Sequence, residues 1–362
     1  MKNTKILYST ILLLVNFLLF SCTSKNTNPI SKEGIVIGTL CSVKIFDKQN
    51  TSILDECFKK LEELEDTLSI NKSNTTIDEV NANAGIKPVK VSKEIIDLTE
   101  YSFKYSELSR GLFDISIGPL VKKWHIGFDD ERVPSPEEIE YAKSKINYKN
   151  IVINHDESTI FLKNTAMMLD FGAIAKGYAA DCLYNILDKN GVKSAIIDLG
   201  GNIFVKGNKM DGSKWNVGIQ DPDEFRGDSL GLVQIENRSL VTSGIYEKYL
   251  EKDGVKYHHI LNPYTGYPET NDLLSITVIS DLSVKGDCLS TVLFFLGKEK
   301  GLEYAESRDD IDVIYVMKDY DVFISSGLKE IFTIINSKYK LKNSINEPGL
   351  ILATSHCLSR ML

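Results

Sequence analysis

Residues 170–203, DFGAIAKGYAADCLYNILDKNGVKSAIIDLGGNI, form the stretch that decides the fold. From Ala175 to Leu187, the apolar side chains fall on one face of a helix. Gly191 follows a polar last turn and predicts a left-handed residue that ends this helix. The apolar run from Ala195 to Leu199 predicts a buried strand, and Gly200-Gly201 allow a backbone or a ligand to approach closely. The stretch therefore predicts a turn, one helix and one central strand.

The entrance of this predicted helix holds Asp170, Gly172, Lys176 and Gly177. Free N–H groups and the helix dipole favour an anion there, and a flexible cation beside exposed amides suits a phosphate group. From this segment alone, an ordinary helix start with a solvated lysine is an equally good interpretation. The helix entrance is thus a first candidate site, for a phosphate-bearing ligand.

Outward from this stretch, helices and strands are mixed along the chain and no period repeats. Before the quoted stretch we expect strands within 34–46, helices at 52–68, 93–110 and 134–144, a broken apolar segment around residues 118–119 and a hairpin within 151–162. After it we expect strands at 214–220, 229–236, 239–247 and 274–279, a helix at 283–296 and a late hairpin within 313–325. This mixture predicts the α/β or α+β class. We expect one compact domain over 34–336 and a detached tail at 337–362.

The first residues have a different character. Lys2 and Lys5 precede an apolar run from Ile6 to Phe20, and Cys22 follows directly after Ser21. A basic start, a short apolar core and a cleavage site are typical of a secretory signal, and a cysteine at the cut marks a bacterial lipoprotein. We expect residues 1–21 to be removed, Cys22 to carry lipid and residues 22–33 to be a tether to the cell membrane or its periplasmic face. A plain cleaved signal peptide is the alternative.

Composition excludes several classes of function. The chain has 362 residues, of which 43% are hydrophobic and 25% charged, as in soluble globular proteins. Removal of residues 1–21 takes two lysines and no acids, which changes the net charge from −8 to −10. Such a charge argues against a nucleic-acid partner, which needs a basic surface. The six cysteines show no zinc-site spacing, and we expect no disulfide; P-loop, GxGxxG and serine-hydrolase motifs are absent.

Two further candidate sites lie towards the C-terminus. Asp287 and Thr291 are four residues apart, so a carboxylate and a hydroxyl share one helix face. A magnesium ion uses such oxygen ligands together with a carbonyl and phosphate oxygens, although Thr291 can instead bond its own backbone and Asp287 can serve the helix dipole. His259, in a turn rich in Gly and Pro, suits a general base or a merely packed, hydrogen-bonded side chain.

Taken together, these motifs resemble the ApbE-type flavin transferase family, the FAD:protein FMN transferases. The resemblance covers roughly residues 35–335 and rests on an ordered series of short motifs: IGT at 37–39, GLFD at 111–114, GPLV at 118–121, DFGAIAKG at 170–177, DLGGN at 198–202, TSG at 242–244, HILNP at 259–263, TG at 265–266 and Asp287 with Thr291. Each motif is weak alone, but the order of the series is highly specific.

The resemblance implies a T-fold-related domain with a cleft for FAD and a magnesium ion at the FAD diphosphate. The implied metal ligands are the carbonyl of Ala173 and the side chains of Asp287 and Thr291. His259 matches the histidine at the reaction centre, and the implied contacts to the flavin nucleotide come from Ile37, Leu112, Phe113, Asp114, Asp170, Lys176 and Leu261. The family moves FMN from FAD to a threonine hydroxyl of a partner protein and releases AMP; an exported or membrane redox protein is the expected acceptor.

One position departs from the family pattern. Relatives often carry an aromatic residue after the Leu-Ser start of the early loop, and Asn71 stands there instead. Because an amide covers less of the flavin and admits more water, we expect hydrolysis of FAD to FMN and AMP alongside transfer. A magnesium-dependent FAD pyrophosphatase and a non-catalytic flavin-binding lipoprotein are the alternative functions. Asp287 and Thr291 argue against pure storage, since a binder needs no metal at the diphosphate.

Overall fold

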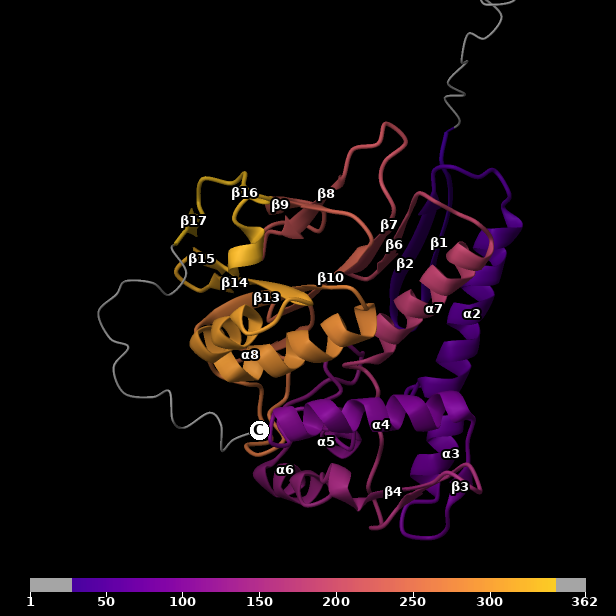
Figure 1. Ribbon diagram of the computed structural model, residues 1–362. Coiled ribbons are helices and arrows are strands. Elements are labelled where there is room, and N and C mark those ends of the chain that lie inside the picture. Colours follow the sequence, from indigo (N-terminus) through magenta and orange to yellow (C-terminus); the bar gives the residue numbers. More distant parts are fainter. Residues whose placement is uncertain (1–27, 343–362) are drawn as a thin grey trace, which may run out of the picture.

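The computed structural model describes residues 28–342 (Figure 1). The expected signal peptide and Cys22 lie outside the described residues. Strand β1 already begins at Ile30, so the last four residues of the expected tether, 30–33, belong to the fold. None of the helices within the described range has the length and apolar character that crossing a membrane requires.

A nine-stranded sheet forms the centre of the molecule. Its strand order is β1-β2-β6-β7-β10-β13-β14-β15-β17, and every neighbouring pair is antiparallel except β15 and β17. The strands are β1 Ile30–Val36, β2 Thr39–Ile45, β6 Ala195–Leu199, β7 Asn202–Lys206, β10 Arg238–Gly244, β13 Leu273–Ser280, β14 Ile311–Met317, β15 Asp321–Ile324 and β17 Lys340–Leu341.

Three long helices, α2 Ser52–Leu68, α7 Ala175–Lys189 and α8 Ser283–Glu306, pack together and against the sheet (Figure 1). The predicted helix from Ala175, its left-handed end at Gly191 (φ 68°) and the following strand β6 are all confirmed. Helix α8 continues beyond the predicted end at residue 296, because the chain resumes helical geometry after a break at Gly297, whose φ is 75°.

A second group of elements lies at one end of the helix layer (Figure 1). It contains α3 Thr76–Ala82, α4 Lys93–Leu108, α5 Gly118–Trp124, α6 Pro136–Lys143, η1 Tyr148–Asn150 and a small sheet of β3 Val89–Lys90, β4 Ile151–Asn154 and β5 Thr159–Leu162. The sequence predicted irregular backbone at Gly118-Pro119, but a helix begins there. The cause is physical: proline fits the first helical turn, where its missing N–H has no partner to lose.

Two smaller sheets complete the fold. Strands β8 Trp215–Gln220, β9 Ser229–Ile235 and β16 Phe332–Ile334 form one, with η2 Ser326–Leu328 beside it, and β11 Tyr249–Lys252 pairs with β12 Val255–His258 in a hairpin. The expected start of a detached tail at residue 337 does not fit the structure. Tyr339 is 3% exposed and donates a hydrogen bond to Asp221, and β17 extends the main sheet.

The main hydrophobic core lies between the sheet and helices α2, α7 and α8. Four cysteines of the described residues carry free thiols and belong to this core or pack against it: Cys41, Cys57, Cys182 and Cys288. Burial raises the pKa of the Cys57 thiol to about 12. A second core supports the outer face of the sheet, and a third joins α5 and α6 to Leu261.

Candidate active site

The site is built where the first turns of α7 and α8 meet. A Cβ atom added at Gly177 would lie 2.4 Å from the carbonyl oxygen of Ser283 and 2.7 Å from Cβ of Asp287, so only glycine permits this approach. The Gly177 N–H donates to Oδ2 of Asp287 at 2.8 Å. Asp287 itself is 4% exposed. The glycine therefore brings the buried carboxylate of one helix to the N-terminus of the other.

Asp181 fixes the same junction from the side of α7. Its carboxylate accepts hydrogen bonds from the backbone N–H groups of Ser283 at 2.8 Å and Val284 at 2.9 Å. These are orphan donors of the first turn of α8, so a side chain of α7 caps α8. Burial raises the pKa of Asp181 to about 6, although both hydrogen bonds oppose this shift. The sequence pattern did not point to this residue, because its partners lie about a hundred positions away.

Two oxygen atoms near the junction have no hydrogen-bond partner among residues 28–342. In a regular helix the Gly177 N–H would bond the carbonyl of Ala173, but it donates to Asp287 instead, which leaves that carbonyl without a donor. The hydroxyl of Thr291, one turn beyond Asp287, is likewise unbonded. Both residues are partly buried.

These donors fit a magnesium ion better than a transition metal. Within residues 28–342, no group of three or more His, Cys, Asp or Glu side chains is arranged to hold a metal. Magnesium commonly takes one or two carboxylates and completes its shell with substrate phosphates and water. One carboxylate, one carbonyl and one hydroxyl at Asp287, Ala173 and Thr291 match that preference.

Positive and negative groups surround the junction. Lys176 Nζ lies 3.9 Å from Oδ1 of Asp287, a long contact that leaves the ammonium group available. Asp170 precedes the helix, and its Oδ1 accepts the Gly172 N–H at 2.7 Å. Burial raises the pKa of Asp170, while that hydrogen bond and the charges of Lys122, Lys176 and Lys248 act in the opposite direction. Asp170 thus shares one electrostatic environment with three lysines.

His259 enters the site from the end of the β11–β12 hairpin. Its Nδ1 lies 3.2 Å from the carbonyl oxygen of Lys248, and its backbone N–H donates to the same oxygen at 3.1 Å. A carbonyl only accepts, so Nδ1 carries the proton and Nε2 has the free lone pair. Although the residue is exposed, the surrounding protein still desolvates its ring. This desolvation, together with the charges of Lys176 and Lys248, lowers the pKa of His259 to about 4.

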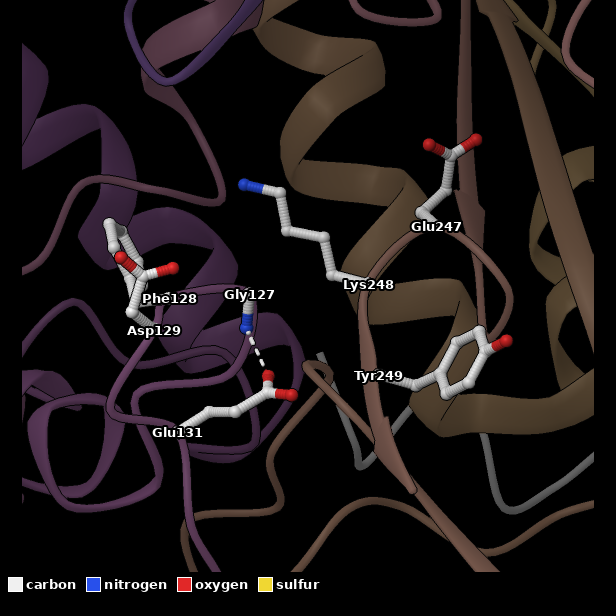
Figure 2. A pocket seen from close by; sticks show the side chains of 7 residues that line it. All are labelled: Gly127, Phe128, Asp129, Glu131, Glu247, Lys248 and Tyr249. Carbon is white, nitrogen blue, oxygen red and sulfur yellow. Dashed lines mark hydrogen bonds between the residues drawn. The ribbon is translucent and has the colours of Figure 1, made fainter.

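A pocket of about 380 Å³ opens between the loop of residues 127–131 and the start of the hairpin, where Lys248 lines it (Figure 2). Its lining mixes charged and aromatic side chains: Gly127, Phe128, Asp129, Glu131, Glu247, Lys248 and Tyr249. Burial raises the pKa of Glu247 and lowers that of Lys248. Their sequence pattern predicts no site, because a charged pair in a turn has the pattern of an ordinary solvated loop.

Two further predicted contact residues, Ile37 and Asn71, lie in connecting segments outside the α7–α8 junction. Ile37 is at the tip of the β1–β2 hairpin with φ 49°, and the next side chain, Thr39, packs against Gly200. Asn71 accepts a hydrogen bond from Lys122 at 2.6 Å. Lys122 is one of the three lysines whose charge acts on Asp170.

The segment of residues 112–115 is joined to the site by a backbone hydrogen bond. The carbonyl of Ile115 accepts the Asp170 N–H at 2.7 Å, so this segment runs beside the start of the deciding stretch. Leu112 is half-buried and Phe113 is 2% exposed. The Asp114 carboxylate accepts hydrogen bonds from Ser116 and Tyr148, which gives it a role in holding the fold. Leu261 is buried in the third core.

The junction of this mixed α/β domain presents an unpaired carbonyl, a buried carboxylate, an unbonded hydroxyl and Lys176 at the start of α7. Such groups suit a phosphate-bearing ligand together with a hard cation. The model of the ApbE family matches residues 37–315. This chain belongs to the ApbE family, as the sequence motifs predicted.

Relatives with an established description agree with that family. An FAD:protein FMN transferase of Treponema pallidum is 34% identical over 329 residues, which cover 86% of this chain and 91% of that protein. One from Klebsiella pneumoniae is 35% identical over 311 residues, covering 86% and 96%. The crystal structure of the ApbE protein of Thermotoga maritima aligns with a TM-score of 0.77 at 26% identity, covering 84% of this chain and 99% of the other. The flavin transferase ApbE from Vibrio cholerae gives 0.74 at 26% identity, with the same coverage.

Proposed function

We propose that this protein is an FAD:protein FMN transferase that moves FMN from FAD to a threonine hydroxyl of an acceptor protein. The observation that carries the proposal is the junction of α7 and α8, where Gly177 turns its N–H to Asp287 and leaves the Ala173 carbonyl free. Family relatives of similar length carry the same description. The acceptor we expect is an exported or membrane redox protein.

The proposed reaction is a single displacement at phosphorus. The threonine oxygen forms a bond to the FMN phosphorus, the phosphoanhydride bond breaks, and its electron pair leaves with the phosphate of AMP. Magnesium held by Ala173, Asp287 and Thr291 would neutralise charge on the diphosphate. Lys176 and the start of α7 add positive potential to the same region. His259 presents Nε2 as the acceptor for the threonine proton, because the Lys248 carbonyl holds the proton on Nδ1.

The direct test combines the protein with FAD, magnesium and a threonine-bearing acceptor, followed by mass spectrometry of the acceptor. A gain of one FMN, together with release of AMP, is the expected result. The same assay without magnesium should give no gain. FMN and AMP formed in solution, with the acceptor unchanged, would instead support the FAD pyrophosphatase, and FAD binding without any product would support a flavin-binding protein.

Hydrolysis is proposed as a second activity of the same site. Asn71 is exposed and bonded to Lys122, so a small polar group, and not an aromatic ring, stands at this position. Water therefore has easier access to the bound nucleotide than a ring would allow. AMP release from FAD and magnesium without an acceptor is the expected sign. Its absence in a preparation that still transfers FMN would remove this part of the proposal.

We also propose that Cys22 anchors the protein to a membrane by lipid. The support is the sequence alone: the basic start, the apolar run and the cysteine after Ser21. In a bacterial expression host, the wild-type protein should incorporate labelled palmitate and remain with membranes. Cys22→Ala should do neither, and labelling of that variant would contradict lipidation at Cys22.

A further inference from the structure

The β11–β12 hairpin places Lys248 opposite His259. The antiparallel register pairs Tyr249 with His258, so the residues just outside that pair face one another. Both contacts of His259 with the Lys248 carbonyl follow from this register. Any substitution of the Lys248 side chain leaves the carbonyl, and with it the position of His259, in place. The side chain is therefore open to a test that does not disturb the histidine.

The Lys248 side chain crosses the face of Gly127. A Cβ atom at Gly127 would lie 3.3 Å from Cδ of Lys248, and the glycine has a φ of 87°, which other residues rarely adopt. Figure 2 shows the ammonium group pointing away from Glu247. Within residues 28–342 it makes no hydrogen bond and has no carboxylate oxygen within 4.0 Å. Gly127 thus leaves room for the Lys248 side chain, whose ammonium group has no ion-pair partner among residues 28–342.

Two such cations face the same region. Lys176 has only the 3.9 Å contact with Asp287. The pKa of Lys248 is lowered by burial and then by the charge of Lys176, while Glu247 and Asp170 act in the opposite direction. Two ammonium groups that repel one another gain most from an anion that lies between them. A diphosphate has the charge and the number of acceptor oxygens for that position.

We propose that Lys248 binds the phosphate of FAD that is transferred, on the His259 side of the diphosphate and across from Lys176. This inference rests on the proposed function and adds a phosphate-binding residue to it. As the threonine oxygen bonds to phosphorus and the electron pair leaves with AMP, the Lys248 ammonium donates to an oxygen of the transferred phosphoryl group. No proton is gained or lost by Lys248 in this step.

The experiment compares Lys248→Met, which keeps length and loses charge, with Lys248→Arg, which keeps the charge. The control is Lys256→Met, an exposed lysine on β12 of the same hairpin. Fluorescence titration measures binding of FAD and of riboflavin, which has no phosphate. Lys248→Met should weaken FAD binding by roughly 10- to 100-fold and leave riboflavin binding unchanged. Lys248→Arg should restore most of the loss, and Lys256→Met should match the wild type.

A second readout separates a charge effect from a structural one. Because Lys176, Lys248 and His258 all lower the pKa of His259, Lys248→Met should raise the titration midpoint of the His259 ring in NMR spectra, and Lys248→Arg should not. Equal loss of FAD and riboflavin binding, or wild-type FAD binding by Lys248→Met, would overturn the inference. Failure of the wild type to modify any acceptor would contradict the transferase function alone, because the two binding titrations do not depend on transfer.

Discussion

At the scale of single residues, the site depends on one buried carboxylate with few protein partners. Asp287 accepts the Gly177 N–H at 2.8 Å and lies 3.9 Å from Lys176 Nζ. Its other oxygen is therefore available to a cation. A carboxylate used only for structure would be surrounded by donors, as Asp114 is. The contrast between these two acids supports a metal-binding role for Asp287.

The variant Asp287→Asn separates charge from shape. The amide oxygen can still accept the Gly177 N–H, so we expect little change in melting temperature. Turnover should fall by at least roughly 100-fold, because the charge that holds the cation is lost. FMN transfer and thermal melting by circular dichroism measure the two effects. A variant that unfolds at a much lower temperature would show a structural role, and full activity would exclude the metal site.

His259 gives a prediction for pH. Its pKa in the folded protein is lowered to about 4, from an ordinary value of 6.5. The neutral form is favoured by folding, so its contribution to stability is complete above pH 6.5 and is lost as the pH falls through 4. The ring is thus neutral near pH 7. NMR should show a ring midpoint well below 6.5, assigned by loss of the signal in His259→Gln; a midpoint at 6.5 or above would contradict this environment.

At the scale of elements, the approach of α7 to α8 determines the site. Three interactions fix it: the missing side chain at Gly177, the hydrogen bond to Asp287 and the cap that Asp181 gives to α8. Both helix N-termini consequently point their positive ends at one region. The positive potential belongs to the fold before any ligand binds.

The variant Gly177→Ala tests this junction. Its Cβ would lie 2.4 Å from a backbone oxygen, which cannot rotate away as a side chain can. We expect the free energy of unfolding to fall by about 1–3 kcal/mol, with a larger loss of FMN transfer because Asp287 moves. Asn185→Ala, exposed on the same helix, serves as the control in urea denaturation. Equal behaviour of the two variants would show that the helices have room to separate.

The elements that sequence could predict are those with a buried face. Helix α2 has the predicted bounds, Ser52 to Leu68, because seven of its side chains form one buried stripe. The β11–β12 hairpin was missed, since most of its side chains are exposed and leave no alternating pattern. For the same reason Lys248 was missed in the site. Only the hairpin register, which no local pattern encodes, brings it to His259.

At the scale of the whole molecule, the folded domain extends further towards the C-terminus than the composition of residues 337–342 indicates. Residues 337–342 are polar apart from Tyr339 and Leu341, so the sequence predicted a tail. One buried aromatic ring decides otherwise. Tyr339 packs edge-on against Tyr320 and donates to Asp221, which also accepts from Asn336. A single anchor of this kind has no period for sequence analysis to detect.

Substitution of this anchor should reveal its contribution. Tyr339→Ala should lower the free energy of unfolding by about 3 kcal/mol, because a buried ring is removed. Tyr339→Phe should cost about 1 kcal/mol, since only the hydrogen bond to Asp221 is lost. Urea denaturation of both variants measures the difference. No loss of stability in Tyr339→Ala would mean that residues 337–342 are held to the fold only weakly.

The free thiols packed in the main core have a consequence for redox chemistry. Thiolates, not thiols, react with oxidants, and burial holds Cys41 and Cys57 protonated with pKa values of about 11 and 12. These sulfur atoms therefore behave as small hydrophobic groups. The enzyme should melt at the same temperature with and without dithiothreitol, and should tolerate an oxidising compartment without the help of an isomerase.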